Sequence, residues 1–361
     1  MKIDKTLLFS VIILMIISLF MIYSASYVWA EYKFNNPFKY VINQGIFSLI
    51  GIIILFIISK IDYKLYYKHA NKLLIVCIVL LILVLIPGLG IVRNGSRSWF
   101  GIGSFSIQPS EFSKIGLIIF TSKYLAKSNK FLQNYKKGIF PILFILLLIF
   151  GLIMLEPDFG TGMIIVLTII ACLFVAGVPM NFFIILFFLG IAGITLLIAI
   201  APYRMDRITS FLNPWSDPLG TGFQIIQSLY AIGPNGLFGV GYLNSRQKAF
   251  YLPEPQTDFI FSIIAEEFGI VGTLVILTLF AIILIRGIKI SLRQENLFAK
   301  YLAFGLIFQL IVQVIMNLSV VIGLIPVTGV TLPFMSYGGS SLLTSLFGIG
   351  ILLNISRQSP N

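Results

Sequence analysis

The sequence predicts an all-α polytopic membrane protein, and three of its properties point that way. Of its 361 residues, 58% are hydrophobic and only 11% are charged. The mean hydropathy is +1.02, far too high for a soluble domain of this length. Apolar runs long enough to cross a hydrocarbon core of about 30 Å recur along the whole chain. Because no polar block could build a separate soluble domain, residues 1–361 are expected to form a single transmembrane domain.

About ten membrane-spanning helices are expected from the length of the apolar runs. The boundaries from the fourth to the sixth run are the least sharp, because the break at residues 156–160 is short. An even number of spans places both ends of the chain on one side of the membrane. The expected spans lie near 7–29, 38–59, 72–92, 110–126, 139–156, 160–177, 181–201, 258–285, 300–323 and 339–355.

The charge distribution predicts the orientation, because cytoplasmic loops of membrane proteins are enriched in Lys and Arg. With the N-terminus in the cytoplasm, most of the 25 basic residues fall inside, whereas most of the 13 acidic residues fall on or near the outer face. The net charge of +12 therefore indicates membrane orientation rather than nucleic-acid binding. The basic residues placed inside are Lys2, Lys5, Lys60, Lys64, Lys68, Lys72, Lys123, Lys127, Lys130, Lys136, Lys137, Arg286, Lys289, Arg293, Lys300 and Arg357.

The two cysteines and the first apolar run argue against a disulfide-linked or metal-binding fold and against a cleaved signal peptide. Cys77 and Cys172 lie in different apolar runs, which indicates neither a disulfide framework nor a metal site. Lys2 and Lys5 precede a run of spanning length without a small-residue cleavage site, so the first run is expected to remain as a helix.

A polar loop enters an apolar segment at residues 253–262, and this junction carries Asp258. A carboxylate at the edge of a bilayer is costly, which makes Asp258 a candidate functional residue. The structural alternative is that Thr257 caps the following helix and Asp258 lies in its first turn, where it suits the helix dipole. Both interpretations are open at this point.

Polar residues gather in three further stretches on the predicted outer side. Glycines and Trp99 in residues 93–103 suggest a short segment folded back over the membrane. Just beyond it, Glu111 and Lys114 are three residues apart at a helix start, where they can pair with each other or contact a substrate. The outer loop at residues 201–257 is long enough to be functional, and residues 222–232 within it can form a surface helix.

The third stretch covers residues 325–341, between the last two spans. Its prolines and paired glycines indicate non-helical backbone near membrane depth, which is tolerated where it is packed in protein or lines a watery cavity. Beyond it, Ser340, Thr344 and Gly348 recur every four residues. This small-residue stripe favours helix packing over chemistry.

Four motifs in this order resemble the SEDS family (shape, elongation, division and sporulation). They are Gln-Pro-Ser-Glu at 108–111, Glu-Pro-Asp-Phe-Gly-Thr at 156–161, Pro-Glu-Pro-Gln-Thr-Asp-Phe-Ile-Phe at 253–261 and Pro-Phe-Met-Ser-Tyr-Gly-Gly-Ser-Ser at 333–341. The residues around 93–99 and 247–255 are more similar to the division and sporulation branch, FtsW and SpoVE, than to RodA. The resemblance implies a peptidoglycan glycosyltransferase that polymerises lipid II at the outer face of the bacterial cytoplasmic membrane, together with a class B penicillin-binding protein.

The resemblance also implies roles for particular residues. The essential outer-loop aspartate of the family falls on Asp258, its substrate-cavity pair on Glu111 and Lys114, and its basic position before the tryptophan on Arg97. Where many relatives have a second basic residue there, this chain has Ser98. In the mechanism that we expect, Asp258 is the general base and undecaprenyl pyrophosphate leaves from the growing glycan strand. The candidate substrate-binding residues are Arg97, Glu111, Lys114, Arg204, Arg207, Arg246, Lys248 and Ser336.

Cofactor use and two competing functions stay open in the sequence. No clustered ligand motif demands a metal, although a divalent cation such as Mg or Mn could bind a carboxylate and the pyrophosphate. A transporter that flips a lipid-linked sugar would use Glu266 and Glu267, although no internal repeat is evident. A third reading is a non-catalytic scaffold for the transpeptidase.

Overall fold

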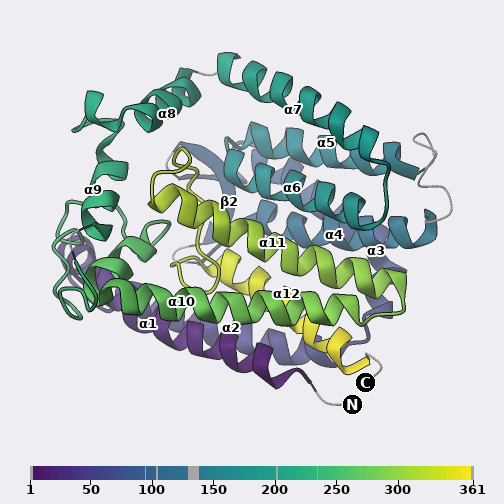
Figure 1. Ribbon diagram of the computed structural model, residues 1–361, viewed down its shortest axis with the longest axis horizontal. Helices are drawn as coiled ribbons and strands as arrows, with labels where there is room; N and C mark the ends of the chain where they lie inside the picture. The colour runs from purple at the N-terminus through teal and green to yellow at the C-terminus, as the bar shows by residue number, and fades with distance from the viewer. Residues whose placement is uncertain are drawn as a thin grey trace.

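The computed structural model describes residues 3–93, 95–102, 105–128, 138–200, 202–233 and 235–358. Figure 1 shows long helices lying side by side, with both termini at one end of the bundle and a small sheet and shorter helices towards the other. A helix coincides with each predicted apolar run. These helices are α1 (Lys5–Phe34), α2 (Lys39–Lys60), α3 (Lys64–Leu85), α4 (Pro109–Ser128), α5 (Phe140–Leu155), α6 (Phe159–Val175), α7 (Met180–Ile200), α10 (Ile260–Leu292), α11 (Leu297–Val321) and α12 (Gly339–Gln358).

The predicted all-α polytopic architecture is confirmed. Among the described residues, seven helices are long and apolar enough to cross a membrane: α1, α2, α3, α7, α10, α11 and α12. The apolar helices α5 and α6 are shorter, with 16 and 17 residues. The number of helices that cross the membrane therefore stays a prediction.

The only strands in the described ranges lie between α3 and α4. The chain forms a three-stranded antiparallel sheet of β1 (Ile91–Arg93), β2 (Ser96–Ile102) and β3 (Phe105–Ile107), in the order β1-β2-β3. The predicted third span at 72–92 was too long at this end, because Pro87 and the left-handed Gly88 (φ 92°) cannot continue α3. The long outer loop contains α8 (Pro202–Leu212), a 3₁₀ turn (Pro214–Ser216) and α9 (Phe223–Ile232), which confirms the helix expected at 222–232.

The first helices of the chain pack against the last ones. α1 lies along α10 and α2 along α12, while α11 contacts α4, α6 and α10. At Gly51 of α2 and Gly350 of α12, an added Cβ would overlap Leu346 and Ile58 of the facing helix, so the missing side chains permit close approach. The surrounding helices enclose α11 and α12. In the most apolar stretch of each, 61% and 78% of the residues are buried.

Helix α10 is interrupted at Gly269, where φ is 59° and ψ is −150°. Residues 236–241 of the outer loop dock into this break and replace the lost helical hydrogen bonds. Only glycine fits on either side, because a Cβ at Gly239 would lie 2.5 Å from the Glu267 carbonyl and one at Gly269 would lie 2.5 Å from Gly239 N. The replacement bonds are Val240 N to Glu266 O (2.9 Å), Gly241 N to Glu267 O (2.9 Å), Ile270 N to Gly236 O (3.2 Å) and Val271 N to Leu237 O (3.0 Å).

The connection from α11 to α12 is non-helical, as its prolines and glycines predicted. Ser336 is buried within it and caps a turn, because its hydroxyl accepts a hydrogen bond from Leu332 N at 2.8 Å. Tyr337 N donates to the carbonyl of Gln256 at 2.8 Å, which joins this connection to the segment that precedes Asp258. Two of the predicted polar regions are therefore in contact.

Candidate active site

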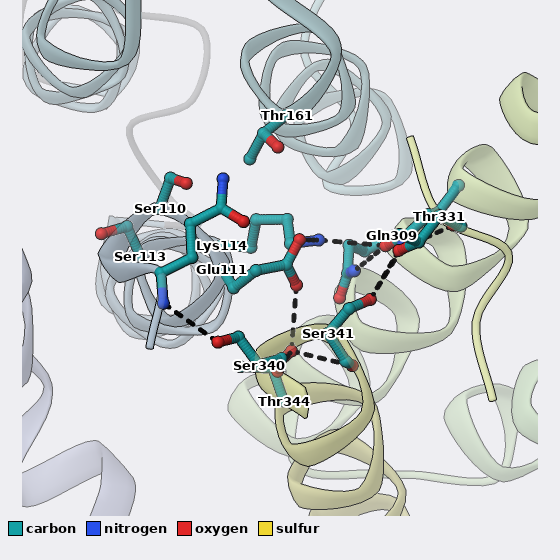
Figure 2. Close-up of polar contacts among 12 residues, drawn as sticks. Ser110, Glu111, Ser113, Lys114, Thr161, Gln309, Thr331, Ser340, Ser341 and Thr344 are labelled. Atoms are coloured by element: carbon teal, nitrogen blue, oxygen red, sulfur yellow. Dashed lines mark hydrogen bonds and ion pairs between the residues drawn. The ribbon is translucent and has the colours of Figure 1, made fainter. Parts of the chain in front are cut away.

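The first turns of α4 carry a buried ion pair. Pro109 begins the helix, where its missing N–H costs nothing, and Glu111 follows in the first turn. The ammonium of Lys114 lies 2.9 Å from Glu111 Oε1, and the two side chains are only 2% and 8% exposed. Figure 2 shows the pair facing polar side chains of α11 and α12. The pairing that the sequence allowed is confirmed, and it takes place inside the bundle.

Side chains from two other helices complete the surroundings of this pair. Lys114 Nζ donates to Gln313 Oε1 of α11 at 3.0 Å, and Thr344 Oγ1 of α12 lies 3.0 Å from Glu111 Oε2. Gln313 Nε2 donates in turn to the carbonyl of Thr331 at 3.0 Å and lies 3.2 Å from Ser341 Oγ. In the stripe of Ser340, Thr344 and Gly348, Thr344 therefore makes a polar contact. Gly348 packs against Leu306 of α11, as expected for helix packing.

A row of amides on α11 links this pair to the outer junction. Gln309, Gln313 and Asn317 are buried and recur every four residues, so they share one helix face. Asn317 Nδ2 lies 2.7 Å from the carbonyl of Asp258 and 2.7 Å from that of Val330. Because four helical residues rise about 6 Å, the main chain of Asp258 is fixed about one turn of α11 from the contact with Lys114.

The structure corrects the capping interpretation of the junction. α10 begins at Ile260, and its N-cap, Phe259, makes no side-chain cap hydrogen bond. Thr257 is therefore not the cap, because its hydroxyl turns back to lie 2.7 Å from the Glu254 carbonyl and 2.9 Å from Asp258 Oδ1. Asp258 is half-buried and precedes the first turn of the helix, in a turn that leaves part of its side chain accessible.

The turn between α5 and α6 adds two carboxyl groups that sequence reasoning did not include in the site. Asp158 is the N-cap of α6, where its Oδ1 accepts from Thr161 N at 3.0 Å, and Gln108 Nε2 donates to its Oδ2 at 2.8 Å. Burial raises the pKa of Asp158, which the hydrogen bonds to Thr161 partly offset and nearby Glu111 reinforces.

Glu156, in the same turn, carries a buried carboxyl group. It is 0% exposed, and neither carboxyl oxygen has a hydrogen-bond partner among the described residues. Burial, reinforced by Asp158, raises the pKa of Glu156 to about 9. Burial therefore favours the protonated form of this carboxyl group. The available signal was two acids in a short break between apolar runs.

The predicted substrate cations occupy different environments. Arg97 lies in β2 with its Nη1 3.4 Å from the Leu85 carbonyl, while its Nε is buried without a hydrogen-bond partner. Arg246 has an exposed side chain. Lys248 is 1% exposed, and its ammonium faces α1 and α10 instead of the Glu111–Lys114 pair. Arg204 and Arg207 belong to α8, but their side chains lie outside the described part of the structure.

Comparison with known proteins places this architecture. The family model described as FTSW_RODA_SPOVE, cell cycle protein, matches residues 5–361. The chain is 52% identical to stage V sporulation protein E of Bacillus subtilis over 356 residues, which cover 99% of this chain and 97% of that protein. It is 40% identical to a protein of Coxiella burnetii named "Probable peptidoglycan glycosyltransferase FtsW" over 361 residues, with coverage of 99% and 97%.

Solved structures share the fold over the whole chain. One structure, described as coordinating polymerization and crosslinking in a peptidoglycan synthase complex, matches with a TM-score of 0.81 and 29% identity, covering 99% of this chain and 98% of that one. The rod shape determining protein RodA of Thermus thermophilus matches with a TM-score of 0.73 and 27% identity, covering 100% and 99%. The chain therefore belongs to the SEDS family of FtsW, RodA and SpoVE proteins, on the FtsW and SpoVE side.

Proposed function

We propose that the protein is a peptidoglycan glycosyltransferase that polymerises lipid II at the outer face of the cytoplasmic membrane. One observation carries the proposal: a buried Glu111–Lys114 pair and the main chain of Asp258 are tied to the same face of α11, about one turn apart. This arrangement anchors a buried cation and the main chain of a half-buried aspartate to one helix within the bundle. FtsW relatives of the chain are named peptidoglycan glycosyltransferases, which agrees with it.

The reaction is an inverting transfer. The 4-hydroxyl of one lipid II GlcNAc attacks the anomeric carbon of the growing strand's MurNAc, and undecaprenyl pyrophosphate leaves. Asp258 accepts the hydroxyl proton, a contribution on the order of 10²- to 10⁴-fold for a positioned base. Lys114 stabilises the negative charge of the leaving pyrophosphate in a site from which water is largely excluded. Asn317 holds the peptide carbonyl of Asp258, and so orients the base.

A divalent cation remains compatible with this chemistry. Among the described residues, no group of three or more His, Cys, Asp and Glu side chains could hold a metal ion. A Mg or Mn ion would therefore take most of its oxygen ligands from the pyrophosphate and water, as Mg commonly does. In that role the ion binds together with the substrate.

Two other observations support the proposed partner and orientation. A solved relative is described as part of a complex for polymerization and crosslinking, and we assign to this chain a class B penicillin-binding protein as its transpeptidase partner. Asp4 N lies 3.3 Å from Ser356 Oγ, so both ends of the chain share one end of the bundle. Asn354 contacts Ser59 and Tyr63 at this end, so Lys60 and Lys64 belong to it as well. The basic character of this end supports cytoplasmic termini.

The test is lipid II polymerisation by wild type and Asp258→Asn, with a candidate class B partner whose catalytic serine is replaced. Asparagine keeps the shape of the side chain and removes its charge. We expect polymer from wild type and a loss on the order of 10²-fold or more for the variant. Glu31→Gln, which neutralises an exposed outer carboxylate at the end of α1, is the matched control and should retain full activity.

The alternatives give different results in the same experiment. Equal polymer from wild type and Asp258→Asn would remove Asp258 as the base. No polymer from wild type with any partner would favour transport or a scaffold. For transport, however, Glu266 and Glu267 would have to exchange the hydrogen bonds that both carboxylates make to the outer loop.

A further inference from the structure

The glutamates beside the break in α10 hold the outer loop by its residues 245–248. Glu266 Oε1 accepts a hydrogen bond from Arg246 N at 2.8 Å, and its Oε2 accepts from the hydroxyl of Ser245. Gln247 N lies 3.4 Å from the same Oε2. The carboxylate therefore binds three consecutive residues of the loop.

The neighbouring carboxylate joins three parts of the chain. Lys248 Nζ lies 2.7 Å from Glu267 Oε1, and these side chains are only 2% and 0% exposed. Ser24 of α1 lies 2.6 Å from Glu267 Oε1 and 3.0 Å from Lys248 Nζ, while the ring of Tyr27 lies 5.0 Å from that ammonium. We call Ser24, Ser245, Lys248, Glu266 and Glu267 the outer clasp.

The outer clasp closes a loop that contains Asp258. Lys248 and Glu267 are 19 residues apart, and Asp258 lies between them. Phe250 (φ 69°) and Glu254 (φ 42°) have left-handed backbone in this loop. Non-glycine residues keep such conformations only where the surroundings over-determine them. Leu252 provides part of that constraint, since it is fully buried.

Stability alone does not explain a buried pair at this place. Two charges lose their hydration on burial, and apolar side chains of similar volume often serve the fold as well or better. A buried ion pair, however, holds its two side chains in one relative position. Removing either partner leaves the other charge buried and uncompensated. We infer that Lys248 and Glu267 are positioning residues that fix the conformation of the segment carrying Asp258. The inference rests on the proposed function, in which Asp258 is the base.

The first experiment compares Lys248→Met and the neutral double variant Lys248→Met/Glu267→Gln in polymerisation of lipid II by the complex described above. The double variant removes the uncompensated charge, so it should unfold at nearly the wild-type temperature. Because the base is no longer held in place, we expect kcat to fall by about 10²-fold in both variants with little change in KM. Recovery of kcat together with folding in the double variant would overturn the inference.

A second measurement does not depend on activity. Leu252→Cys is introduced after Cys77 and Cys172 are replaced by serine, and its labelling by a membrane-impermeant maleimide is timed. Slow labelling in the intact clasp and labelling at least about tenfold faster in both clasp variants are expected, because the closed state protects buried groups. Equally slow labelling would overturn the inference. If wild type makes no polymer, the proposed function fails while this measurement still decides whether the clasp holds the loop.

The cytoplasmic end of the same two helices supplies a matched control. There, Arg286 Nη2 of α10 lies 2.6 Å from Oδ2 of Asp4, which caps α1. Asp4→Ala/Arg286→Met also removes the cap of α1, so it should lower the unfolding temperature without changing kcat per folded molecule or the labelling of Cys at position 252. A similar loss of kcat in this control would show that general destabilisation explains the clasp variants, and would overturn the inference.

Discussion

Two lysine–glutamate pairs are buried in the described part of the chain, and they differ in what they join. Glu111 and Lys114 lie three residues apart on α4, so their contact connects groups that the helix already holds together. Lys248 and Glu267 join the outer loop to α10 and also contact Ser24 of α1. A helical pair adds only about 0.2–0.5 kcal/mol to a helix, whereas removing charges from water costs several kcal/mol for each ion.

This difference agrees with our proposals that the first pair serves chemistry and that the second positions the loop. The contact between Glu111 and Lys114 adds little to α4 by itself, and the pair also binds Gln313 of α11 and Thr344 of α12. We propose that a substrate accounts for the rest of the cost of their burial. Lys248 and Glu267 connect distant segments, so their burial has a consequence for the shape of the loop. Removal of either lysine should reveal this distinction.

The largest effect is expected for Lys114→Met. Loss of this cation should lower polymerisation on the order of 10²- to 10³-fold, and the Glu111 charge left without its partner should also lower the unfolding temperature. Steady-state rates and thermal unfolding of the purified complex measure both quantities. Lys123→Met on the same helix is the control, because Lys123 contacts Asn71 and the ring of Tyr67 outside the site. A rate above a tenth of wild type would contradict the chemical role.

Gly269→Ala tests the break in α10 that brings Glu267 to Lys248. The positive φ and the contact with Gly239 N should together cost about 1–3 kcal/mol of folding free energy or more. Thermal unfolding measures this loss. At Gly190 of α7 an added Cβ meets no atom within 4 Å, so Gly190→Ala should instead stabilise the protein by about 0.5–1 kcal/mol. An undiminished unfolding temperature for Gly269→Ala would show that the break in α10 adapts.

Asn317→Ala tests the contact between α11 and the main chain of Asp258. The variant leaves the carbonyls of Asp258 and Val330 without their donor, at a cost of about 1–3 kcal/mol. Asn354→Ala removes a buried amide that bridges Ser59 O and Tyr63 N at the end of the bundle that carries both termini. Both variants should lose similar stability, and only Asn317→Ala should lower kcat. Equal activity of the two variants would remove the positioning role of Asn317.

The last prediction concerns the pH dependence of stability at Glu156. Its pKa is raised from 4.5 to about 9 in the folded protein, so the folded state binds the proton more tightly than the unfolded state. Its contribution to stability is complete below pH 4.5 and is lost as the pH rises towards 9, with a slope of at most about 1.4 kcal/mol per pH unit. Glu156→Gln should flatten this part of the profile and stabilise the protein near pH 8. Unchanged slopes in thermal unfolding from pH 5 to 9 would contradict the prediction.

The sequence predicted the bundle because apolar length and charge asymmetry depend on local composition. It also predicted the contact between Glu111 and Lys114, since spacing along one helix is sufficient for that. The amides of α11 could have been found by the same reasoning, because Gln309, Gln313 and Asn317 are costly in an apolar run. Their partners could not, because the connection at 325–338 has no periodic pattern.

The contacts of Lys248 could be found only from the tertiary structure. Sequence reasoning grouped it with substrate cations because it precedes Asp258 in a polar loop. Its contact with Glu267 requires the docking of residues 236–241 into the break at Gly269, and a single glycine in an apolar run does not reveal such a break. The capping interpretation of Thr257 was wrong for a related reason, because the turn at 254–257 captures its hydroxyl.

The packing of the first helices against the last ones has a consequence for biogenesis. Ser24 meets Glu267 only after 243 further residues have been made, and the main-chain amide of Asp4 meets Ser356 after 352. On a ribosome that delivers helices in order, α1 and α2 must therefore remain in the lipid phase while the middle of the protein is inserted. The candidate site near α11 and α12 is assembled among the last events of synthesis. A chain that stalls before α10 therefore has apolar helices in the membrane but no assembled candidate site.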